Sequence, residues 1–180
     1  QCDVAVFMVD ASTGSVSQDS KIAGMIHDQG KGVVVVFNKW DLIEGKATNT
    51  HQDYWEEFCR DVPFRPSAPW FMLSAETRQR TGRNMEKVWE VHEARQKRIP
   101  TSELNETIEQ IVRFQQPRAH GGGLGKIYYA TQADRQPPTF VLSVNEPKFF
   151  ARNYLRFINN QLRKEYGFTG NRIFVKMKKH

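Results

Sequence analysis

The 180-residue sequence has few of the features that mark disulfide-stabilised, metal-binding or membrane-spanning proteins. Its two cysteines, Cys2 and Cys59, are far apart and do not have the spacing of metal ligands. No run approaches the roughly 20 apolar residues that a membrane helix needs, and the first residues lack the layout of a signal peptide. We therefore expect reduced thiols, no metal ligands in this chain, no membrane span and a cytoplasmic location.

Positive charge is not in excess in the first part of the chain, but it is in the second. Residues 1–100 contain 13 Lys and Arg against 14 Asp and Glu, whereas residues 101–180 contain 13 against 6. The net charge of +6 therefore comes entirely from the second part. This asymmetry predicts two domains, of which the second meets a polyanion, although a basic surface is also common in proteins that bind nothing.

The most apolar segment, Val33 to Phe37, consists of β-branched and aromatic residues without polar alternation. Such a run is typical of a strand buried on both faces of a parallel sheet. Residues 3–10 and 70–73 have the same character. Helical patterns lie between and after these strands, at residues 19–29, around residues 54–58 and at residues 84–98. The order β-α-β-α-β-α predicts an α/β fold with a parallel sheet and right-handed crossovers.

Polar residues follow the central strand in the order Asn38-Lys39-Trp40-Asp41. In open α/β sheets, ligands bind beyond the carboxyl ends of the strands, where these residues are expected. The spacing Asn-Lys-x-Asp resembles the guanine-reading motif of the Ras-like GTPases. The dipeptide Ser74-Ala75, which ends the next strand, resembles their second guanine-contacting motif. An ordinary polar turn after a core strand is the alternative interpretation, and the placement of both motifs at strand ends argues against it.

The resemblance implies a role for each of these residues. Asp41 would accept the two adjacent donors of guanine in a bidentate pair, which adenine cannot supply. Lys39 would lay its methylene stem along the base. Asn38 would tie the loop to the phosphate loop and to the base edge, and the N–H of Ala75, next to Ser74, would donate to the exocyclic oxygen of guanine.

Two phosphate-binding motifs of GTPases do not occur in the sequence. It contains no G-x-x-x-x-G-K-[ST] loop and no Asp-x-x-Gly segment that senses the γ-phosphate through Mg²⁺. The run Gly121 to Gly125 is followed by Lys126 and then Ile127, so a flexible loop is a better interpretation than a phosphate cradle. We therefore expect the chain to hold the second half of a GTPase domain, without a catalytic residue of its own.

Residues 101–180 carry the pattern α-β-β-α-β of a small α+β domain. We expect a helix that a hydroxyl side chain caps after Pro100, strands at 126–132 and 139–144, a long helix at 147–166 and a last strand at 171–177. Four segments resemble the C-terminal KH-like domain of the bacterial Der (EngA) GTPases, at residues 100–104, 126–132, 137–141 and 166–170. With the guanine motifs upstream, the resemblance covers essentially the whole chain.

Membership of this family implies two tandem GTPase domains followed by the KH-like module. Residues 1–99 would be the last part of the second GTPase domain, and residues 100–180 the KH-like domain. The full-length protein would bind GTP and GDP with Mg²⁺, hydrolyse GTP, and act on the large ribosomal subunit and its rRNA during late assembly. The chain alone, without the upstream GTPase domain and the first half of the second, is expected to be inactive.

Two other functions are compatible with the residues. One is a non-hydrolysing RNA- or protein-binding protein that keeps a degenerate GTPase scaffold. The other is an Era-like protein with a single GTPase domain, although its RNA clamp should sit between two helices. A phosphate loop and an Asp-x-x-Gly motif encoded upstream of Gln1 would select the Der-like function.

Candidate RNA contacts lie on the last helix and in the basic tail. RNA-binding KH domains hold nucleotides with a Gly-x-x-Gly loop between helices, and Gly167 to Gly170 fits that string but precedes a strand. We interpret Gly167 as a helix C-cap. The remaining candidates are basic residues that could equally form a solvated helix face or tail, namely Arg152, Arg156, Arg163, Lys164, Lys178 and Lys179.

Overall fold

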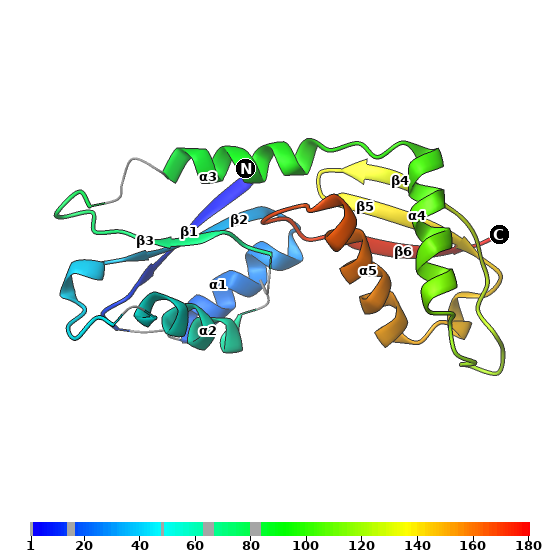
Figure 1. Cartoon of the computed structure of the whole chain (residues 1–180), viewed down its shortest axis with the longest axis horizontal. Coiled ribbons are helices and arrows are strands. Elements are labelled where there is room, and N and C mark those ends of the chain that lie inside the picture. The colour runs from blue at the N-terminus through cyan, green and yellow to red at the C-terminus, as the bar shows by residue number, and fades with distance from the viewer. Residues whose placement is uncertain (1, 14–16, 48, 63–66, 80–83) are drawn as a thin grey trace. The chain divides into compact units, whose positions relative to one another are not determined.

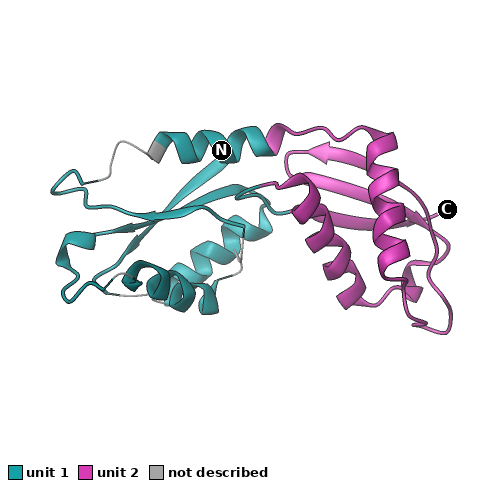
Figure 2. Ribbon diagram, viewed as in Figure 1, with its two compact units in different colours: residues 1–94, 169–172 teal, residues 95–168, 173–180 magenta. Residues whose placement is uncertain are grey.

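The computed structural model describes residues 2–13, 17–47, 49–62, 67–79 and 84–180. They form two compact units (Figure 2). Unit 1 contains residues 1–94 together with 169–172, and unit 2 contains residues 95–168 together with 173–180. Because residues 169–172 belong to unit 1, the chain does not divide at one point, and the expected domain border at residue 99 stays a prediction.

Unit 1 is built on a three-stranded parallel sheet (Figure 1). Its strands are β1 (Val4–Asp10), β2 (Gly32–Asn38) and β3 (Trp70–Met72), in the order β1-β2-β3. The register pairs the last residue of β1, Asp10, with the last residue of β2, Asn38. The two loops that follow these strands therefore start side by side. The expected α/β fold with a parallel sheet is confirmed.

Helices cover both faces of this sheet. Helices α1 (Ser17–Asp28) and α2 (Thr50–Asp61) pack on the face that carries Val33, Val35 and Phe37. Helix α3 (Asn84–Gln96) packs on the opposite face, which carries Val34 and Val36. All five of these β2 residues are at most 4% exposed, which explains why the strand has no polar alternation.

Strand β1 forms an edge of the described sheet. Phe7 and Val9 are buried under α1 and α2, whereas Val6 and Met8, on the alternate face, are 50% and 53% exposed. A bare strand edge beside half-exposed apolar side chains is an association-prone surface.

Unit 2 has two layers, a three-stranded sheet and a pair of helices. Its sheet contains β4 (Ile127–Arg135), β5 (Pro138–Val144) and β6 (Phe174–Lys179), with β4 and β5 antiparallel and β5 and β6 parallel. Helices α4 (Thr101–Phe114) and α5 (Arg152–Tyr166) cover one face through a core that includes Leu104, Ile158 and Leu162. The order α-β-β-α-β agrees with the sequence-based prediction.

Two local predictions in unit 2 need correction, and the Gly121 loop has a defined turn. The helix expected from Pro147 is a short 3-10 turn, η3 (Pro147–Phe149), and α5 begins only at Arg152. The N-cap position of α4 is Pro100, without a side-chain cap. The Gly121 loop is a turn in which His120 and Gly123 exchange hydrogen bonds at 2.9 and 3.2 Å. A Cβ at Gly123 would lie 2.5 Å from the Phe149 ring, so tight packing requires glycine there.

The last strand also begins later than predicted, at Phe174 instead of residue 171. The preceding residues pair within unit 1, where Val33 donates its N–H to the carbonyl of Gly170 at 2.9 Å. The buried Asn171 side chain donates to the carbonyl of Val91, also at 2.9 Å. Residues whose backbone and side chains are used in this way cannot extend β6.

Within the described ranges, no helix is long and apolar enough to cross a bilayer, and no group of three or more His, Cys, Asp or Glu could hold a metal ion. Cys2 is exposed, Cys59 is buried, and neither forms a disulfide.

Candidate functional site

The candidate site lies at the carboxyl ends of β1, β2 and β3 in unit 1. The three loops are joined there by backbone hydrogen bonds. Ala11 donates to the carbonyl of Asn38 at 2.9 Å, and Trp40 donates to the carbonyl of Leu73 at 3.1 Å. Both predicted motifs are thus brought to one edge of the sheet, together with residues that follow β1.

Asn38 connects the two predicted motifs directly. Its side-chain oxygen Oδ1 accepts a hydrogen bond from the N–H of Ala75 at 3.0 Å, across 37 positions of sequence. The side chain of Ser74 is fully buried, and its Oγ accepts from the N–H of Thr77 at 3.1 Å, which stabilises the turn after β3. Asn38 therefore fixes the position of the Ser74-Ala75 loop relative to the end of β2.

Lys39 has a backbone conformation that is rare for a residue with a side chain. Its φ and ψ of 61° and 32° are left-handed, immediately before the 3-10 turn η1 (Trp40–Leu42). Residues in such conformations cluster at active sites, ligand clamps and switch regions. The left-handed residue turns the chain sharply at the strand end, so that Asp41 follows within the first turn of η1.

The side chain of Lys39 forms an ion pair that the sequence did not predict. Its Nζ lies 2.6 Å from Oδ2 of Asp10, while the other Asp10 oxygen accepts hydrogen bonds from the N–H of Ser12 at 2.9 Å and its Oγ at 2.5 Å. The hydrogen bond from Lys39, followed by that from Ser12, lowers the pKa of Asp10 to about 2. The same pair raises the pKa of Lys39.

A sequence signal for Asp10 did exist. The first strand run ends in an acidic residue, and parallel strands place their carboxyl ends at one edge of the sheet. Because Asp10 pairs in register with Asn38, an acidic residue there is well placed to meet the lysine that follows Asn38.

Asp41 carries the clearest signal for a ligand. Its oxygen Oδ1 is buried and has no hydrogen-bond partner among the described residues. A buried carboxylate oxygen without a donor is costly, and in native structures such an atom calls for an explanation. A ligand with N–H donors at these strand ends would supply the missing partner.

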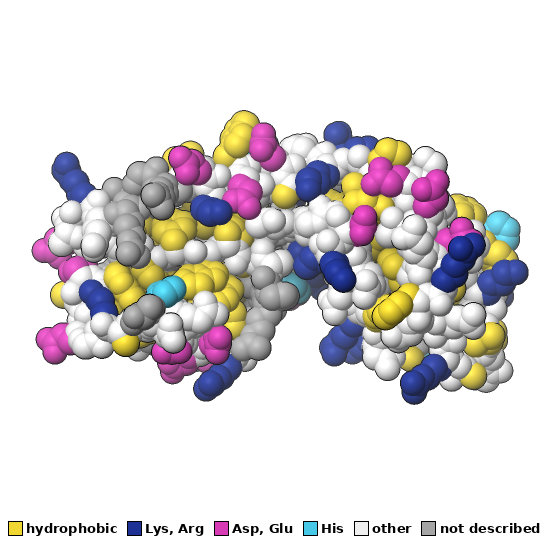
Figure 3. Space-filling model, viewed as in Figure 1, with side chains coloured by type: hydrophobic (Ala, Val, Ile, Leu, Met, Phe, Trp, Pro, Cys, Tyr) yellow, Lys and Arg dark blue, Asp and Glu magenta, His cyan; other side chains and the backbone are white. Residues whose placement is uncertain are grey.

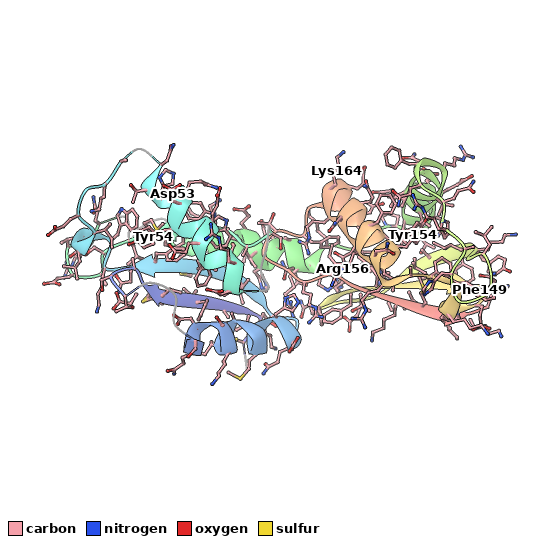
Figure 4. All side chains as sticks on the ribbon, turned by 90° about the horizontal axis from the view of Figure 1, so that it is seen from below. Asp53, Tyr54, Phe149, Tyr154, Arg156 and Lys164 are labelled. Atoms are coloured by element: carbon pink, nitrogen blue, oxygen red, sulfur yellow. The ribbon has the colours of Figure 1, made fainter. Side chains whose placement is uncertain are left out.

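Aromatic residues support the loop that carries Asp41. Trp40 is buried and meets Tyr54 of α2 edge to face at 5.3 Å between ring centroids (Tyr54 is labelled in Figure 4). The Nζ of Lys46 lies 5.6 Å from the centroid of the Trp40 ring. The variable position of Asn-Lys-x-Asp is therefore a packing anchor for the loop.

One part of the geometry differs from the expected contact. The N–H of Ala75, expected to donate to a guanine oxygen, is engaged by Asn38 Oδ1. Guanine would have to share or displace this hydrogen bond. Among the other predicted residues, Lys39 is half exposed, and the unpaired oxygen of Asp41 is buried.

The predicted RNA contacts in unit 2 have varied surroundings. Arg152, Arg156 and Lys164 are exposed on α5 (Arg156 and Lys164 are labelled in Figure 4). Arg163 is partly buried, donates to the carbonyl of Phe168 at 3.1 Å, and has its pKa lowered by burial. Lys179 pairs with Glu146 at 2.9 Å, whereas Lys178 has no carboxylate within 4.0 Å in the described part of the chain. Lys and Arg side chains are spread over unit 2 on the face that Figure 3 shows.

Comparison with known protein families gives two matches along the chain. Residues 1–116 match the family described as the elongation factor Tu GTP binding domain. Residues 98–178 match the family described as the KH-domain-like of EngA bacterial GTPase enzymes, C-terminal. The first covers well over half of the chain.

Individual relatives agree with this division. The chain is 40% identical over 179 residues to GTPase Der of Caldanaerobacter subterraneus, 41% over 177 residues to that of Thermoanaerobacter sp. X514, and 42% over 174 residues to that of Nostoc sp. PCC 7120. These alignments cover 99%, 98% and 96% of this chain but only 40%, 40% and 38% of the relatives. The chain thus spans about two fifths of the length of the curated relatives it matches.

Proposed function

Because the chain belongs to the Der (EngA) family of GTPases, we propose that it is part of a longer protein that hydrolyses GTP and acts in late assembly of the large ribosomal subunit. Residues 1–99 supply the last part of a GTPase domain, and residues 100–180 a KH-like domain that meets rRNA. The protein works in the cytoplasm. The name of the relatives, GTPase Der, supports the GTPase activity, and the ribosomal role extends beyond that name.

In this proposal, unit 1 recognises the guanine base. Asp41 accepts the two adjacent N–H donors of guanine, Lys39 lies along the base, and Asn38 with Ser74 and Ala75 shapes the far wall. The observation that carries the proposal is the buried, unpaired Oδ1 of Asp41 at the carboxyl end of β2. A base with two adjacent donors satisfies that oxygen, whereas adenine leaves it unpaired.

The Lys39–Asp10 pair contributes pre-organisation. With its Nζ held at 2.6 Å from Asp10, the lysine side chain is fixed at the strand ends before a nucleotide arrives. Less side-chain freedom is then lost when the base binds. Asp10 is therefore a positioning residue, which acts through Lys39.

The phosphates and Mg²⁺ require groups that we do not assign to this chain. The residues at the strand ends fit the base, and the described ranges contain no cluster suited to a metal ion. When bound, Mg²⁺ neutralises charge on the phosphates. We assign its ligands, and the phosphate loop, to the part of the protein upstream of residue 1, and we expect the isolated chain to be inactive.

The test is the change Asp41→Asn in the full-length protein, with hydrolysis of GTP and of xanthosine triphosphate compared. Xanthine offers an acceptor where guanine offers its amine, so the amide of the variant matches it. We expect the part of kcat/KM for GTP that the second GTPase domain supplies to fall on the order of 100-fold or more, and activity with xanthosine triphosphate to rise.

A matched control is Asp53→Asn, the same change on an exposed position of α2 (Figure 4). It should leave both activities within about twofold, because it lies outside the strand-end loops. Equal loss of GTP activity in both variants, or no change in base preference for Asp41→Asn, would contradict the assignment.

A further inference from the structure

The sheet of unit 2 has an open face that carries aromatic and basic side chains. Side chains alternate between the faces of a sheet, and the helices cover the face of Ala130, Phe140 and Leu142. The register places Tyr129, Ser143 and Lys178 in one row across the other face. The next row on that face contains Thr131, Val141 and Lys176.

A β-bulge brings a second tyrosine to this face. The pairing of β4 with β5 is shifted between Ile127 and Tyr129, so Tyr128 is the extra residue. A bulge turns two neighbouring side chains toward the same side of a sheet. Tyr128 and Tyr129 are 45% and 47% exposed, although tyrosine rings are usually well covered.

His180 completes a cluster of three exposed rings. Its ring centroid lies 4.8 Å from that of Tyr128 and 5.9 Å from that of Tyr129. The backbone N–H of His180 donates to the carbonyl of Val144 at 2.9 Å, and the ring atom Nδ1 lies 3.2 Å from the Oγ of Ser143. The rings are thus held in place by the sheet itself and need little ordering when a ligand binds.

Three lysines surround this cluster without acidic partners. No carboxylate lies within 4.0 Å of the Nζ of Lys126, Lys176 or Lys178 among the described residues. Lys126 lies 5.2 Å from the centroid of the Tyr128 ring. Lys176 and Lys178 alternate along β6, roughly 7 Å apart by the rise of a strand. The face therefore combines flat rings with unneutralised positive charge.

We propose that this open face, Tyr128, Tyr129 and His180 with Lys126, Lys176 and Lys178, binds single-stranded RNA. Unpaired bases stack on the exposed rings, and the lysines contact the backbone phosphates. An acidic protein surface would use the lysines but would not require exposed π-faces. Except for Lys178, this surface differs from the contacts predicted on α5 and in the tail, since α5 lies on the opposite side of the sheet.

The proposal rests on the proposed function only in naming RNA as the polyanion. Its test does not involve nucleotide hydrolysis, so the two can fail separately. Binding of a fluorescently labelled 12-nucleotide RNA to the full-length protein is followed by anisotropy, from 50 to 200 mM salt. The Asp53→Asn variant, changed at an exposed position of α2, is expected to bind this RNA as the parent protein does.

Tyr129→Ala removes one stacking ring, and Tyr129→Phe keeps it. We expect roughly 5- to 100-fold weaker binding for Tyr129→Ala, and binding within about twofold for Tyr129→Phe because the hydroxyl has no role in stacking. An RNA duplex of the same sequence, whose base faces are covered, should bind on the order of tenfold more weakly.

The double change Lys176→Gln with Lys178→Gln tests the phosphate contacts and leaves the core unchanged, since both side chains are exposed. It should lower the slope of log K against log salt by about 1.4, the value for two phosphates on a single strand. The control Arg113→Gln with Arg118→Gln removes the same charge from exposed positions on and after α4 and should leave the slope unchanged.

Four results would overturn the proposal. The first is an RNA affinity that Tyr129→Ala does not change, and the second is equal affinity for the duplex and the single strand. The third is the same salt slope for the lysine double variant and the arginine double variant. The fourth is a loss of RNA affinity that occurs only with Arg156→Gln and Lys164→Gln on α5. Unchanged RNA binding in every open-face variant would exclude this face as an RNA contact.

Discussion

The two sheets of this chain place functional groups in different positions, because their faces are covered differently. In unit 1 helices cover both faces of β2, and five consecutive residues from Val33 to Phe37 are buried. In unit 2 helices cover one face, and β4 and β6 have exposed residues that include Tyr128, Tyr129, Lys176 and Lys178. A sheet buried on both sides can present polar groups only at its strand ends, whereas a half-covered sheet can also use its open face.

The largest effect is expected from the covered face of unit 2. Phe140 is fully buried and meets Phe168 edge to face at 5.8 Å, so Phe140→Ala should cost about 3–5 kcal/mol of unfolding free energy. Lys176→Ala, on the open face, should stay within about 0.5 kcal/mol. Chemical denaturation of the 180-residue chain measures both. A large cost at Lys176 would mean that the face is covered after all.

The second prediction concerns neighbouring residues of β2 in unit 1. Val35 and Val36 point to opposite faces and are 0% and 1% exposed. Val35→Ala and Val36→Ala should each cost roughly 2 kcal/mol, because both side chains leave a cavity under helices. In unit 2, Met177→Ala should cost more unfolding free energy than Lys176→Ala, because Met177 packs against the core and Lys176 is exposed. Equal losses of unfolding free energy at Lys176 and Met177, or no loss at Val35 or Val36, would show that the two sheets are not covered differently.

The smallest effect is expected at the strand-end ion pair, and it depends on pH. Because the folded pKa of Asp10, about 2, is below the ordinary value of 3.8, the ionised form stabilises the fold. This contribution is fully present above about pH 4 and is lost as the pH falls toward 2. An NMR titration of the Asp10 carboxyl should show the low pKa.

Lys39→Met provides the control for that titration. It removes the first cause of the low pKa of Asp10, the hydrogen bond from Lys39, and leaves the contacts with Ser12. The pKa should rise toward 3.8 but remain below it. A pKa that does not change in the variant would show that Lys39 is not held by Asp10 in solution.

Most of the fold could be predicted from the sequence because its apolar patterns are strong. The apolar run at β2 and the helical patterns on either side of it predicted a parallel sheet, and the pattern of the second part predicted α-β-β-α-β. The predicted element boundaries were wrong where tertiary contacts override the local sequence pattern. The segment before β6 pairs with Val33 instead of extending the strand, and the rings of Phe149 and Phe150 pack against Gly123 and Gly125 where a continuous helix was expected.

The sequence by itself determined the identity of the strand-end residues, the family and the division into a near-neutral and a basic part, because these depend on residue type and order. Only the tertiary structure decided which distant groups meet. It brings Asn38 to Ala75 and Lys39 to Asp10, it leaves Asp41 Oδ1 buried and unpaired, and it gathers Tyr128, Tyr129 and His180 on one open face. Strand register and burial fix these contacts, and neither can be read from spacing along the chain.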